Sequence, residues 1–443
     1  MRTSKSYHFN NINSFKVNIL AWAQQFDKFV WLDSNDATTS NFDGVLAVDM
    51  HSEIQCDYKN SFEKLKEYQQ KTTDFIFGYL GYDLKNDVEK LHSKNFDGLH
   101  FPDLYFFQPK KIFFISGNTV EVKYLYDYKN ELASDLEEIR HYERSEAISL
   151  KEKDYRVVPP PNDNNKVKIK LRIHKGEYYS KINKILAHIL RGNIYEVSFC
   201  QEFFAKNSTI DPLKVYQELN NISSSPFATF LKLDDKFLLS ASPERFLKRT
   251  GNTIISQPIK GTIKRGKNQS EDKELIALLE NDTKERAENI MIVDLVRNDL
   301  SKTAIKGSVK VTELCKVYTF KQLHQLISTV VSEVKTETNS VDIIKSLFPM
   351  GSMTGAPKIA AMKIIEDLEE TKRSLYSGAV GYFSPSGDFD FNVVIRSILY
   401  NQSEKYISYS VGGAITAKSI PEKEYEECLL KAKAMREVLL KSN

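Results

Sequence analysis

The sequence predicts a fold of mixed helices and strands, in which a strand-rich region precedes a longer region of alternating helices and strands. Segments rich in β-branched and aromatic residues crowd the first 130 residues, whereas apolar residues at helical spacing occur between strand-like segments after residue 170. Between them, VVPPPNDNNKVKIK (157–170) has the prolines, Asn and Asp typical of a linker. We therefore predict an N-terminal strand-rich region (1–156), a linker or crossover (157–170) and a C-terminal region (171–443).

The N-terminal region is expected to consist mainly of strands, followed by one helix. Alternating apolar residues and a high content of aromatic side chains predict the strands, and a run of charged residues predicts a helix at 129–149. The strands are expected at 29–34, 43–50, 74–83, 104–117 and 119–126.

In the C-terminal region, apolar residues at helical spacing predict a helix at 175–190, and Gly192 follows as a stop signal. The last helix begins at Pro421, because proline is favoured at the first helical position. Further helices are expected at about 283–300, 321–333 and 358–370, and strands at 196–204, 227–233, 236–243, 378–385, 390–399 and 406–416.

The composition argues against several classes of function. Of the 443 residues, 41% are hydrophobic and 27% are charged, which is ordinary for a soluble globular protein. The net charge of +3 (62 − 59) is too small to favour nucleic acid or an anionic membrane as a partner. No signal peptide or membrane-spanning stretch is visible, so a cytoplasmic protein is expected. The four cysteines are scattered and lack zinc-type spacing, so we expect reduced, structural thiols.

Two predicted helices carry carboxylates on their apolar faces. Glu285 and Glu288 align with apolar residues of the first helix, and Glu424 and Glu427 share a face with Lys431 and apolar residues of the second. A buried carboxylate is unfavourable unless it is paired or bound to metal. Two inward-facing Glu-x-x-Glu pairs suit a hard divalent cation such as Mg²⁺. Solvated acids are the alternative, and the sequence leaves open whether the helices meet.

Other segments offer groups that could bind anions. GSMTGAPK (351–358) lacks the spacing of a nucleotide-binding phosphate loop, but its turn could present backbone N–H groups to an anion. SVGGAIT (410–416) contains paired glycines that would let a carboxylate approach the backbone. Arg396 is an isolated cation among Val and Ile residues, and its fork fits either an acidic side chain or a substrate carboxylate. Ordinary turns remain the alternative for both glycine segments, but together these groups describe a site for a small polyanion.

At this point the order of the motifs resembles that of the chorismate-utilising enzymes. This family includes anthranilate synthase component I, aminodeoxychorismate synthase component I, and the isochorismate and salicylate synthases. The resemblance covers residues 170–443 and is weak in the N-terminal region. It rests on SPERF (242–246), PIKGT (258–262), KERAENIMIVDLVRNDL (284–300), GSMTGAPK (351–358), YSGAVGYF (376–383), IRS (395–397), SVGGAI (410–415) and EYEE (424–427).

The resemblance implies a fold and a set of site residues. It implies an α+β fold like that of anthranilate synthase component I, in which both regions contribute strands to a two-sheet sandwich surrounded by helices. The boundary near 160 would then mark a crossover within one composite fold. It also implies Mg²⁺ held by Glu285, Glu288, Glu424 and Glu427, together with a carboxylate of the substrate. The residues expected to contact substrate are Glu196, Gly261, Thr262, Thr354, Gly355, Tyr376, Arg396, Gly412, Gly413 and Lys431.

Lys260 in PIKGT carries the prediction of subtype, because anthranilate synthases have alanine where aminodeoxychorismate synthases have this lysine. The resemblance implies that the amine attacks the chorismate ring and expels the C4 hydroxyl, after which ammonia displaces the lysine. The product would be 4-amino-4-deoxychorismate, for 4-aminobenzoate and folate synthesis. Glu244 in SPERF would protonate the departing hydroxyl. We expect burial, Mg²⁺ and arginine charge to lower the pKa of Lys260, since a nucleophilic amine must be neutral.

Two positions depart from the family's usual residues. Glu196 stands where many amine-transferring members have Gln and where water-using members have a basic Lys. It therefore argues against isochorismate synthesis, and its charge could orient ammonia or ammonium. Gln325 stands where anthranilate and salicylate synthases have a His linked to pyruvate elimination, and His324 is one residue earlier. Gln325 fits a product that keeps its enolpyruvyl group.

No glutaminase motif is visible, so ammonia is expected to come from a separate glutamine amidotransferase subunit in a heterodimer. An anthranilate synthase component I or a bifunctional enzyme is the alternative within the family. A non-enzymatic module binding nucleic acid through IKRGK (263–267) is disfavoured by the near-neutral charge and by aromatic residues that do not interleave with the basic ones. The sequence does not indicate whether tryptophan binds the N-terminal region, nor the oligomeric state.

Overall fold

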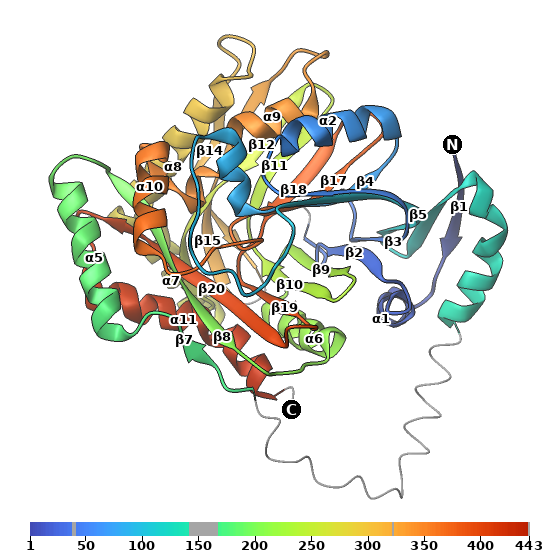
Figure 1. Ribbon diagram of the computed structural model, residues 1–443, viewed down its shortest axis with the longest axis horizontal. Coiled ribbons are helices and arrows are strands. Elements are labelled where there is room, and N and C mark those ends of the chain that lie inside the picture. The colour runs from blue at the N-terminus through green and yellow to red at the C-terminus, as the bar shows by residue number, and fades with distance from the viewer. Residues whose placement is uncertain (38–40, 141–166, 321–322, 442–443) are drawn as a thin grey trace, which may run out of the picture.

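The computed structural model describes residues 1–37, 41–140, 167–320 and 323–441. Residues 157–166 of the predicted linker, and 141–149 of the predicted helix before it, lie outside these ranges. Helices surround a large antiparallel sheet that takes strands from both regions of the chain (Figure 1), so the predicted α+β fold class is confirmed.

In the N-terminal region, all of the predicted strands are present. They correspond to β2 (Lys28–Asp33), β3 (Gly44–Cys56), β4 (Ile76–Leu80), β5 (Leu104–Ser116) and β6 (Thr119–Leu125). Strand β1 (Arg2–His8), which pairs with β6, and the helices α1 (Ile12–Ala23) and α2 (Ser61–Thr72) were not predicted. A 3₁₀ helix, η2 (Tyr126–Glu131), and helical residues 132–140 occupy the described part of the predicted helix.

The C-terminal region alternates helices and strands, as predicted. Its helices are α5 (Lys175–Leu190), α6 (Pro212–Ser223), α7 (Gln269–Asn281), α8 (Thr283–Ser301), α9 (Ser340–Leu347), α10 (Lys358–Leu368) and α11 (Pro421–Lys441). Its strands are β7 (Lys170–Leu171), β8 (Glu196–Ala205), β9 (Phe227–Leu233), β10 (Lys236–Ser242), β11 (Arg245–Thr250), β12 (Thr253–Gln257), β13 (Ile259–Lys264), β14 (Lys310–Thr319), β15 (Leu323–Glu333), β16 (Gly355–Ala356), β17 (Ala379–Phe383), β18 (Phe389–Val393), β19 (Ser397–Asn401) and β20 (Tyr406–Thr416).

The helix predicted at 321–333 is wrong, because residues 323–333 form strand β15. Leu323, Leu326, Ile327 and Val330 have the spacing of a helical face, which explains the error. However, β15 lies between β14 on one side and β12 and β13 on the other, so most of its residues are buried. A strand buried on both faces reads as a continuous apolar run, which hides the two-residue period.

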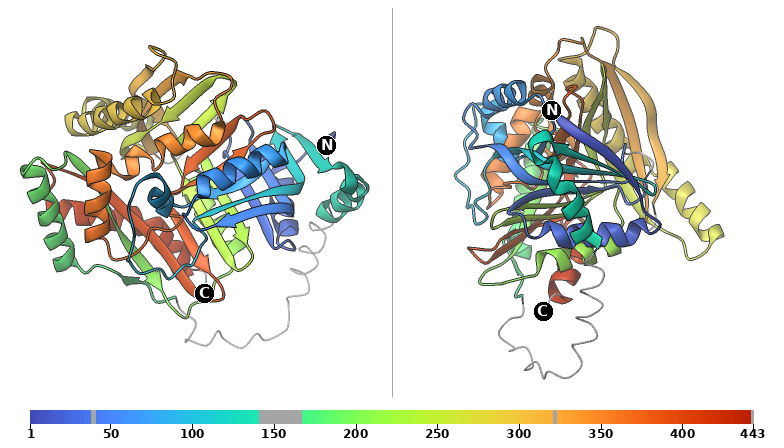
Figure 2. Two further views of the ribbon diagram at one scale, coloured as in Figure 1. Left: turned by 45° about the horizontal axis from the view of Figure 1, so that its top comes forward. Right: turned by 90° about the vertical axis from the view of Figure 1, so that its right-hand side faces the viewer.

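Strands from the two sides of the predicted linker pair directly with each other. Strand β2 lies between β3 and β9, and β4 lies between β5 and β17. Gly78 faces Gly381 in the β4–β17 pair, and a side chain at Gly78 would come within 2.0 Å of the carbonyl oxygen of Tyr105. Figure 2 shows the blue N-terminal strands running beside the green and orange C-terminal ones. The sheet therefore joins the two regions into one unit.

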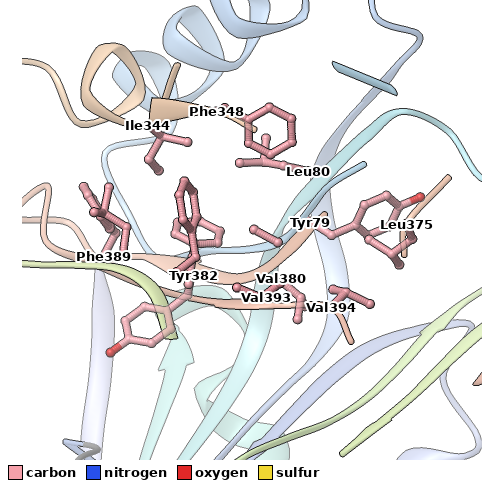
Figure 3. Packing of buried hydrophobic residues seen from close by; sticks show 14 of the residues in the cluster. Tyr79, Leu80, Ile344, Phe348, Leu375, Val380, Tyr382, Phe389, Val393 and Val394 are labelled. Carbon is pink, nitrogen blue, oxygen red and sulfur yellow. The ribbon is translucent and has the colours of Figure 1, made fainter. Parts of the chain in front are cut away.

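The hydrophobic core also draws on both regions. Leu80 from β4 packs in one cluster with Val380 and Val393 from β17 and β18, and with Ile344 and Phe348 at the end of α9 (Figure 3). A second cluster contains Trp22 and Trp31 from the N-terminal region and Leu439 from the last helix. The four cysteines are free thiols, as expected. Among the described helices, none combines the length and the apolar character needed to cross a membrane.

Candidate active site

One cavity of about 570 Å³ gathers most of the residues that the sequence singled out. Thirteen of the sixteen predicted site residues line it, and three do not. The lining residues are Glu244, Lys260, Gly261, Thr262, Glu285, Glu288, Tyr376, Arg396, Gly412, Gly413, Glu424, Glu427 and Lys431. Glu196, Thr354 and Gly355 lie behind its wall.

Helices α8 and α11 place their carboxylates around this same cavity. Burial is the main reason that the pKa of Glu288 is raised to about 7, and repulsion from Glu285 adds to it although lysines oppose it. Burial likewise raises the pKa of Glu285 and Glu424, and the charge of Glu427 contributes in both cases. Only Glu427 has a lowered pKa, because Lys431 Nζ lies 2.7 Å from its Oε1 and outweighs the effect of burial.

These carboxylates have the chemistry of a hard-cation site. Glu288 Oε1 is buried without a hydrogen-bond partner, and neighbouring acids add to the raised pKa of Glu285 and Glu288 although Lys260, Lys284 and Lys431 oppose this effect. Oxygen ligands of this kind suit Mg²⁺. Within the described ranges, no three His, Cys, Asp or Glu side chains already converge as a compact ligand set. The residues present therefore fit a divalent cation, although their described side chains do not form a closed coordination shell.

Lys260 enters the cavity from β13, and its amine is in contact with Glu196. Lys260 Nζ lies 3.3 Å from Glu196 Oε1, and only 15% of the lysine side chain is exposed. Burial alone would lower the pKa of Lys260, but the carboxylates of Glu196, Glu288 and Glu244 outweigh it and raise the pKa. The expected lowering of this pKa depends on bound Mg²⁺, and in the protein without metal or substrate the pKa of Lys260 is raised instead.

Glu244 follows β10 and is held by a serine of the GSMTGAPK segment. Its Oε1 accepts a hydrogen bond of 2.7 Å from Ser352 Oγ, and the residue is 5% exposed. Burial raises its pKa to about 7, although the hydrogen bond from Ser352 and the charge of Lys260 oppose this shift. A carboxyl group with this pKa can carry a proton near neutral pH and can donate it to a leaving group.

Arg396 brings a positive charge to the cavity. It lies between β18 and β19 with φ 51°, not within a continuous strand as predicted. Burial lowers its pKa, and the nearby Tyr376 and Glu427 oppose that effect. In the part of the chain that the structure describes, its guanidinium donates no hydrogen bond and forms no ion pair. Such a cation in a cavity is suited to bind a carboxylate.

The paired glycines of β20 complete this end of the cavity. Lys431 Nζ donates a hydrogen bond of 3.0 Å to the carbonyl oxygen of Gly412. A Cβ atom at Gly413 would lie 3.3 Å from Glu424 Oε2, so a side chain would crowd the carboxylates. The absence of side chains thus keeps backbone and acids accessible to a ligand.

Thr354 and Gly355 brace the wall behind the cavity and do not line it. The N–H of Ser198 donates to the carbonyl of Thr354, and the N–H of Tyr195 to that of Ala356, both at 2.7 Å. Gly355 has φ +149°, and a Cβ there would lie 2.2 Å from the carbonyl oxygen of Glu196. The GSMTGAPK segment therefore fixes the start of β8, which carries Glu196.

Several lining residues were not among the predicted site residues. They are Ser198, Lys264, Lys284, Leu323, Gln325, Ser352, Met353 and Leu430, with Pro243, Ile259, Ile395, Ser410, Val411 and Ala414. Ser352 belongs to the GSMTGAPK motif, so its position two residues before Thr354 was an available signal. Gln325 had been noted only for its departure from histidine, and its Oε1 is buried without a partner.

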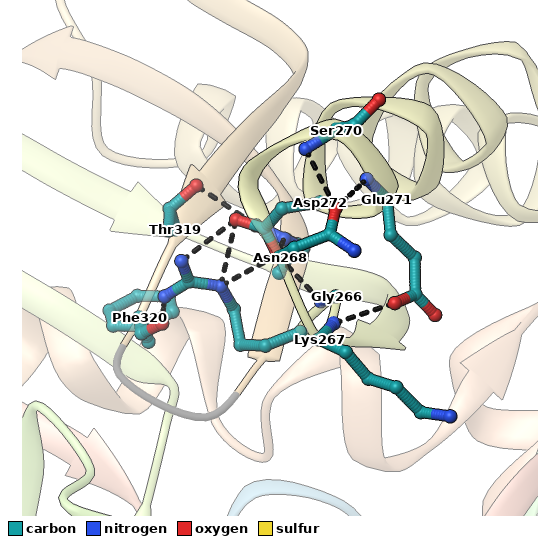
Figure 4. A network of polar contacts seen from close by, with 10 residues as sticks. Gly266, Lys267, Asn268, Ser270, Glu271, Asp272, Thr319 and Phe320 are labelled. Carbon is teal, nitrogen blue, oxygen red and sulfur yellow. Dashed lines mark hydrogen bonds and ion pairs between the residues drawn. The ribbon is translucent and has the colours of Figure 1, made fainter.

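His324 faces away from the cavity because neighbouring residues of a strand point to opposite sides. Its Nε2 lies 3.0 Å from Asp272 of α7, and its Nδ1 lies 2.9 Å from Thr319 Oγ1. Asp272 also accepts a hydrogen bond of 2.7 Å from Nη2 of Arg265, in the polar network of Figure 4. Arg265 of the IKRGK stretch is thus hydrogen-bonded within the protein, and Lys264 lines the cavity. Both observations weaken the case for a basic surface that binds nucleic acid.

The antiparallel α+β fold and a cavity that combines carboxylates, a lysine and an arginine define an enzyme with a site for a small anion. The chain belongs to the family of chorismate binding enzymes, whose sequence profile matches residues 16–437.

Comparison with individual proteins agrees with this assignment. The chain is 35% identical to an anthranilate synthase component I-like protein of Synechocystis over 359 residues, which are 81% of this chain and 71% of that protein. It is also 35% identical to the chloroplastic aminodeoxychorismate synthase of Arabidopsis thaliana over 389 residues, 83% of this chain but only 41% of that longer protein. The structure of anthranilate synthase component I from Streptococcus pneumoniae aligns with a TM-score of 0.73 at 26% identity, covering 90% of this chain and 93% of that one.

Proposed function

We propose that this protein is an aminodeoxychorismate synthase, which converts chorismate and ammonia to 4-amino-4-deoxychorismate for 4-aminobenzoate and folate synthesis. The observation that carries the proposal is the position of Lys260, whose amine enters the cavity between Glu196 and the carboxylates of α8. The similarity of this chain to the Arabidopsis aminodeoxychorismate synthase supports the same activity.

Chorismate carries two carboxylates, and the cavity offers a place for each. Arg396 and the backbone beside Gly413 are suited to one of them. Glu285, Glu288, Glu424 and Glu427 would hold Mg²⁺, which when bound would neutralise their charge and anchor the other carboxylate. Tyr376 and Thr262 would border the ring between these two ends.

The chain's own residues supply a covalent route for the amination. Neutral Lys260 attacks the ring, the C4–O bond breaks, and Glu244 gives its proton so that the hydroxyl leaves as water. Ammonia then displaces the lysine, and the surplus proton of the new amine returns to Glu244. Covalent catalysis divides one difficult displacement into two easier ones. Gln325 is consistent with a product that retains the enolpyruvyl group.

Ammonia is proposed to come from a glutamine amidotransferase subunit that forms a heterodimer with this chain, in the cytoplasm.

Identification of the product tests the proposal directly. The purified protein, incubated with chorismate, Mg²⁺ and ammonium chloride, is expected to form 4-amino-4-deoxychorismate, detected by liquid chromatography and mass spectrometry. A reaction without ammonium is the control. Anthranilate as the main product would overturn the subtype in favour of anthranilate synthase, and a mixture of both products would indicate a bifunctional enzyme.

A further inference from the structure

Glu196 is the closest partner of the proposed nucleophile, and nothing in the reaction described above uses it. Its Oε1 is 3.3 Å from Lys260 Nζ, and its side chain is only 2% exposed. Its second oxygen, Oε2, is buried and has no hydrogen-bond partner among the described residues. A buried carboxylate with one unsatisfied oxygen is unfavourable, so its retention beside a lysine calls for a chemical reason.

The backbone around Glu196 holds the carboxylate in a fixed position. Glu196 begins β8, where it pairs with Thr416 of β20 on one side and with Ala356 of β16 on the other. Gly355 allows this second pairing, because any side chain there would collide with the carbonyl of Glu196. The contact with Lys260 therefore joins two strands, β8 and β13, whose positions are set independently.

Other acids face Lys260 but none replaces Glu196. The charges of Glu288, from α8, and of Glu244, after β10, both act on the amine. Neither accepts a hydrogen bond from Lys260 Nζ in the described structure, and Glu244 is bonded to Ser352. Among the described side chains, Glu196 alone is in place to exchange a proton with the amine through an existing hydrogen bond.

We propose that Glu196 is the proton acceptor that converts the Lys260 ammonium to the neutral, nucleophilic amine. This inference rests on the proposed function. One proton moves from Lys260 Nζ to the Glu196 carboxylate, the amine forms its bond to the ring carbon, and the C4 hydroxyl leaves as water with the proton of Glu244. When ammonia attacks, the C–N bond to Lys260 breaks, the amine leaves with its electron pair and it recovers the proton from Glu196.

The burial of the pair makes this transfer physically reasonable. A lysine whose ammonium form is favoured by three carboxylates does not lose its proton readily to water. Inside a closed site, burial disfavours both the Lys260 ammonium and the Glu196 carboxylate. The energy of this ion pair therefore approaches that of the neutral amine beside the neutral acid. A direct hop to Glu196 also needs no water at the reaction centre.

A purely electrostatic role for Glu196 predicts the opposite behaviour. If the carboxylate only stabilised the ammonium, then Glu196→Gln would lower the pKa of Lys260 and would make every reaction of the amine faster. If Glu196 is the proton acceptor, the same substitution speeds reactions of the free amine with a reagent but slows its attack on chorismate. The two roles therefore differ in sign.

The first measurement follows the covalent adduct without ammonia. Wild type, Glu196→Gln and Glu202→Gln are mixed with chorismate and Mg²⁺, quenched, and analysed by intact mass spectrometry and peptide mapping. Glu202 is a matched control, because it is also a buried acid of β8 but bonds to Arg172, Tyr406 and Ser408, outside the cavity. We expect adduct formation on Lys260 to slow about 100-fold in Glu196→Gln, as is typical for loss of a proton-transfer group, and to be unchanged in Glu202→Gln.

The second measurement labels Lys260 in the ligand-free proteins with trinitrobenzenesulfonate, followed by peptide mapping. Labelling is expected to be faster in Glu196→Gln than in wild type, because the carboxylate no longer favours the ammonium, and a circular dichroism spectrum like that of wild type would show that the variant is folded. Adduct formation in Glu196→Gln at or above the wild-type rate would overturn the inference while leaving the proposed function intact. Absence of any Lys260 adduct in wild type would overturn both, and product analysis with ammonium would then show whether amination persists by another route.

Discussion

Two residues in the cavity are both favoured in their protonated forms, one as a neutral acid and the other as a cation. Glu244 is buried with a single hydroxyl partner, so its pKa rises to about 7 and the neutral acid becomes accessible. Lys260 is also shielded, but three carboxylates face it and the ammonium form is favoured. A displacement with a poor leaving group requires an acid that holds a proton for the leaving group and an amine that loses its proton before it attacks.

Replacement of Lys260 tests the covalent step. Lys260→Ala is expected to lower the rate of 4-amino-4-deoxychorismate formation at least about 100-fold, or to shift the product toward anthranilate, because direct attack by ammonia lacks the activated intermediate. Steady-state rates and product analysis with saturating ammonium measure this. Lys267→Ala is the control, since that exposed lysine lies in the same basic stretch. Wild-type rates and product in Lys260→Ala would remove the covalent role.

The raised pKa of Glu244 also predicts how stability depends on pH. The folded-state pKa of about 7 exceeds the ordinary value of 4.5, so the stability that the neutral acid contributes is complete below pH 4.5 and is lost as the pH rises to about 7. Between pH 5 and pH 8, the unfolding free energy of wild type should therefore fall more than that of Glu244→Gln, by on the order of 3 kcal/mol. Urea unfolding at both pH values measures the difference. Parallel losses in the two proteins would contradict the assigned shift.

At the scale of elements, α8 and α11 present their acids to one space that they share. The helices come from opposite ends of the C-terminal region, yet Glu285 and Glu288 line the same cavity as Glu424 and Glu427. Their mutual repulsion weakens the protein when no cation is present, and a bound cation should reverse this effect. The pair of helices is thus expected to respond to metal as a unit.

Neutralising one acid should change stability in opposite directions with and without metal. Without Mg²⁺, Glu424→Gln is expected to melt a few degrees higher than wild type, because burial and repulsion both disfavour the carboxylate. With Mg²⁺ in excess, wild type should gain stability and the variant should gain much less. Differential scanning fluorimetry across a Mg²⁺ titration measures both effects. Glu426→Gln, on the exposed face of α11, should behave like wild type; an equal Mg²⁺ response in Glu424→Gln would place the cation elsewhere.

Features that depend on residues close in sequence could be predicted, and features that depend on residues far apart in sequence could not. Glu424 and Glu427 were recognisable because helical geometry alone sets which residues share their face. Strand β15 was not, because its burial on both faces depends also on β12 and β13, whose pairings with it are remote in sequence. Lys260 and Glu196 are 64 positions apart in sequence, and two strands bring them together at the cavity. No local sequence pattern therefore indicates this contact. The raised pKa of Lys260 was missed for the same reason.

At the scale of the whole molecule, the two regions form one structural unit. The β2–β9 and β4–β17 pairs join strands that the sequence assigns to different regions, and the Trp22 cluster includes the end of the last helix. Separating the regions would expose sheet edges and apolar surface on both sides. The chain is therefore expected to unfold cooperatively.

The tryptophans offer a direct test of this cooperativity. Both of them, Trp22 and Trp31, lie in the N-terminal region and are fully buried, so their fluorescence reports on the packing around that region. Far-ultraviolet circular dichroism reports on the whole chain. We expect the two thermal transitions to coincide within about one degree, as for a single cooperative unit. A fluorescence transition several degrees below the dichroism transition would show that the N-terminal region unfolds on its own.

The placement of α11 has a consequence for incomplete copies of this protein. Pro421–Lys441 supplies two of the four carboxylates, Lys431, and apolar side chains of the core cluster that also contains both tryptophans. A polypeptide released by a premature stop between Glu288 and Pro421 would keep Lys260 and Glu244 but would lack half of the acids around the cavity. Such a fragment could neither complete the pocket nor cover its own core. Truncated products should therefore be cleared by proteases and should not compete with intact enzyme for substrate.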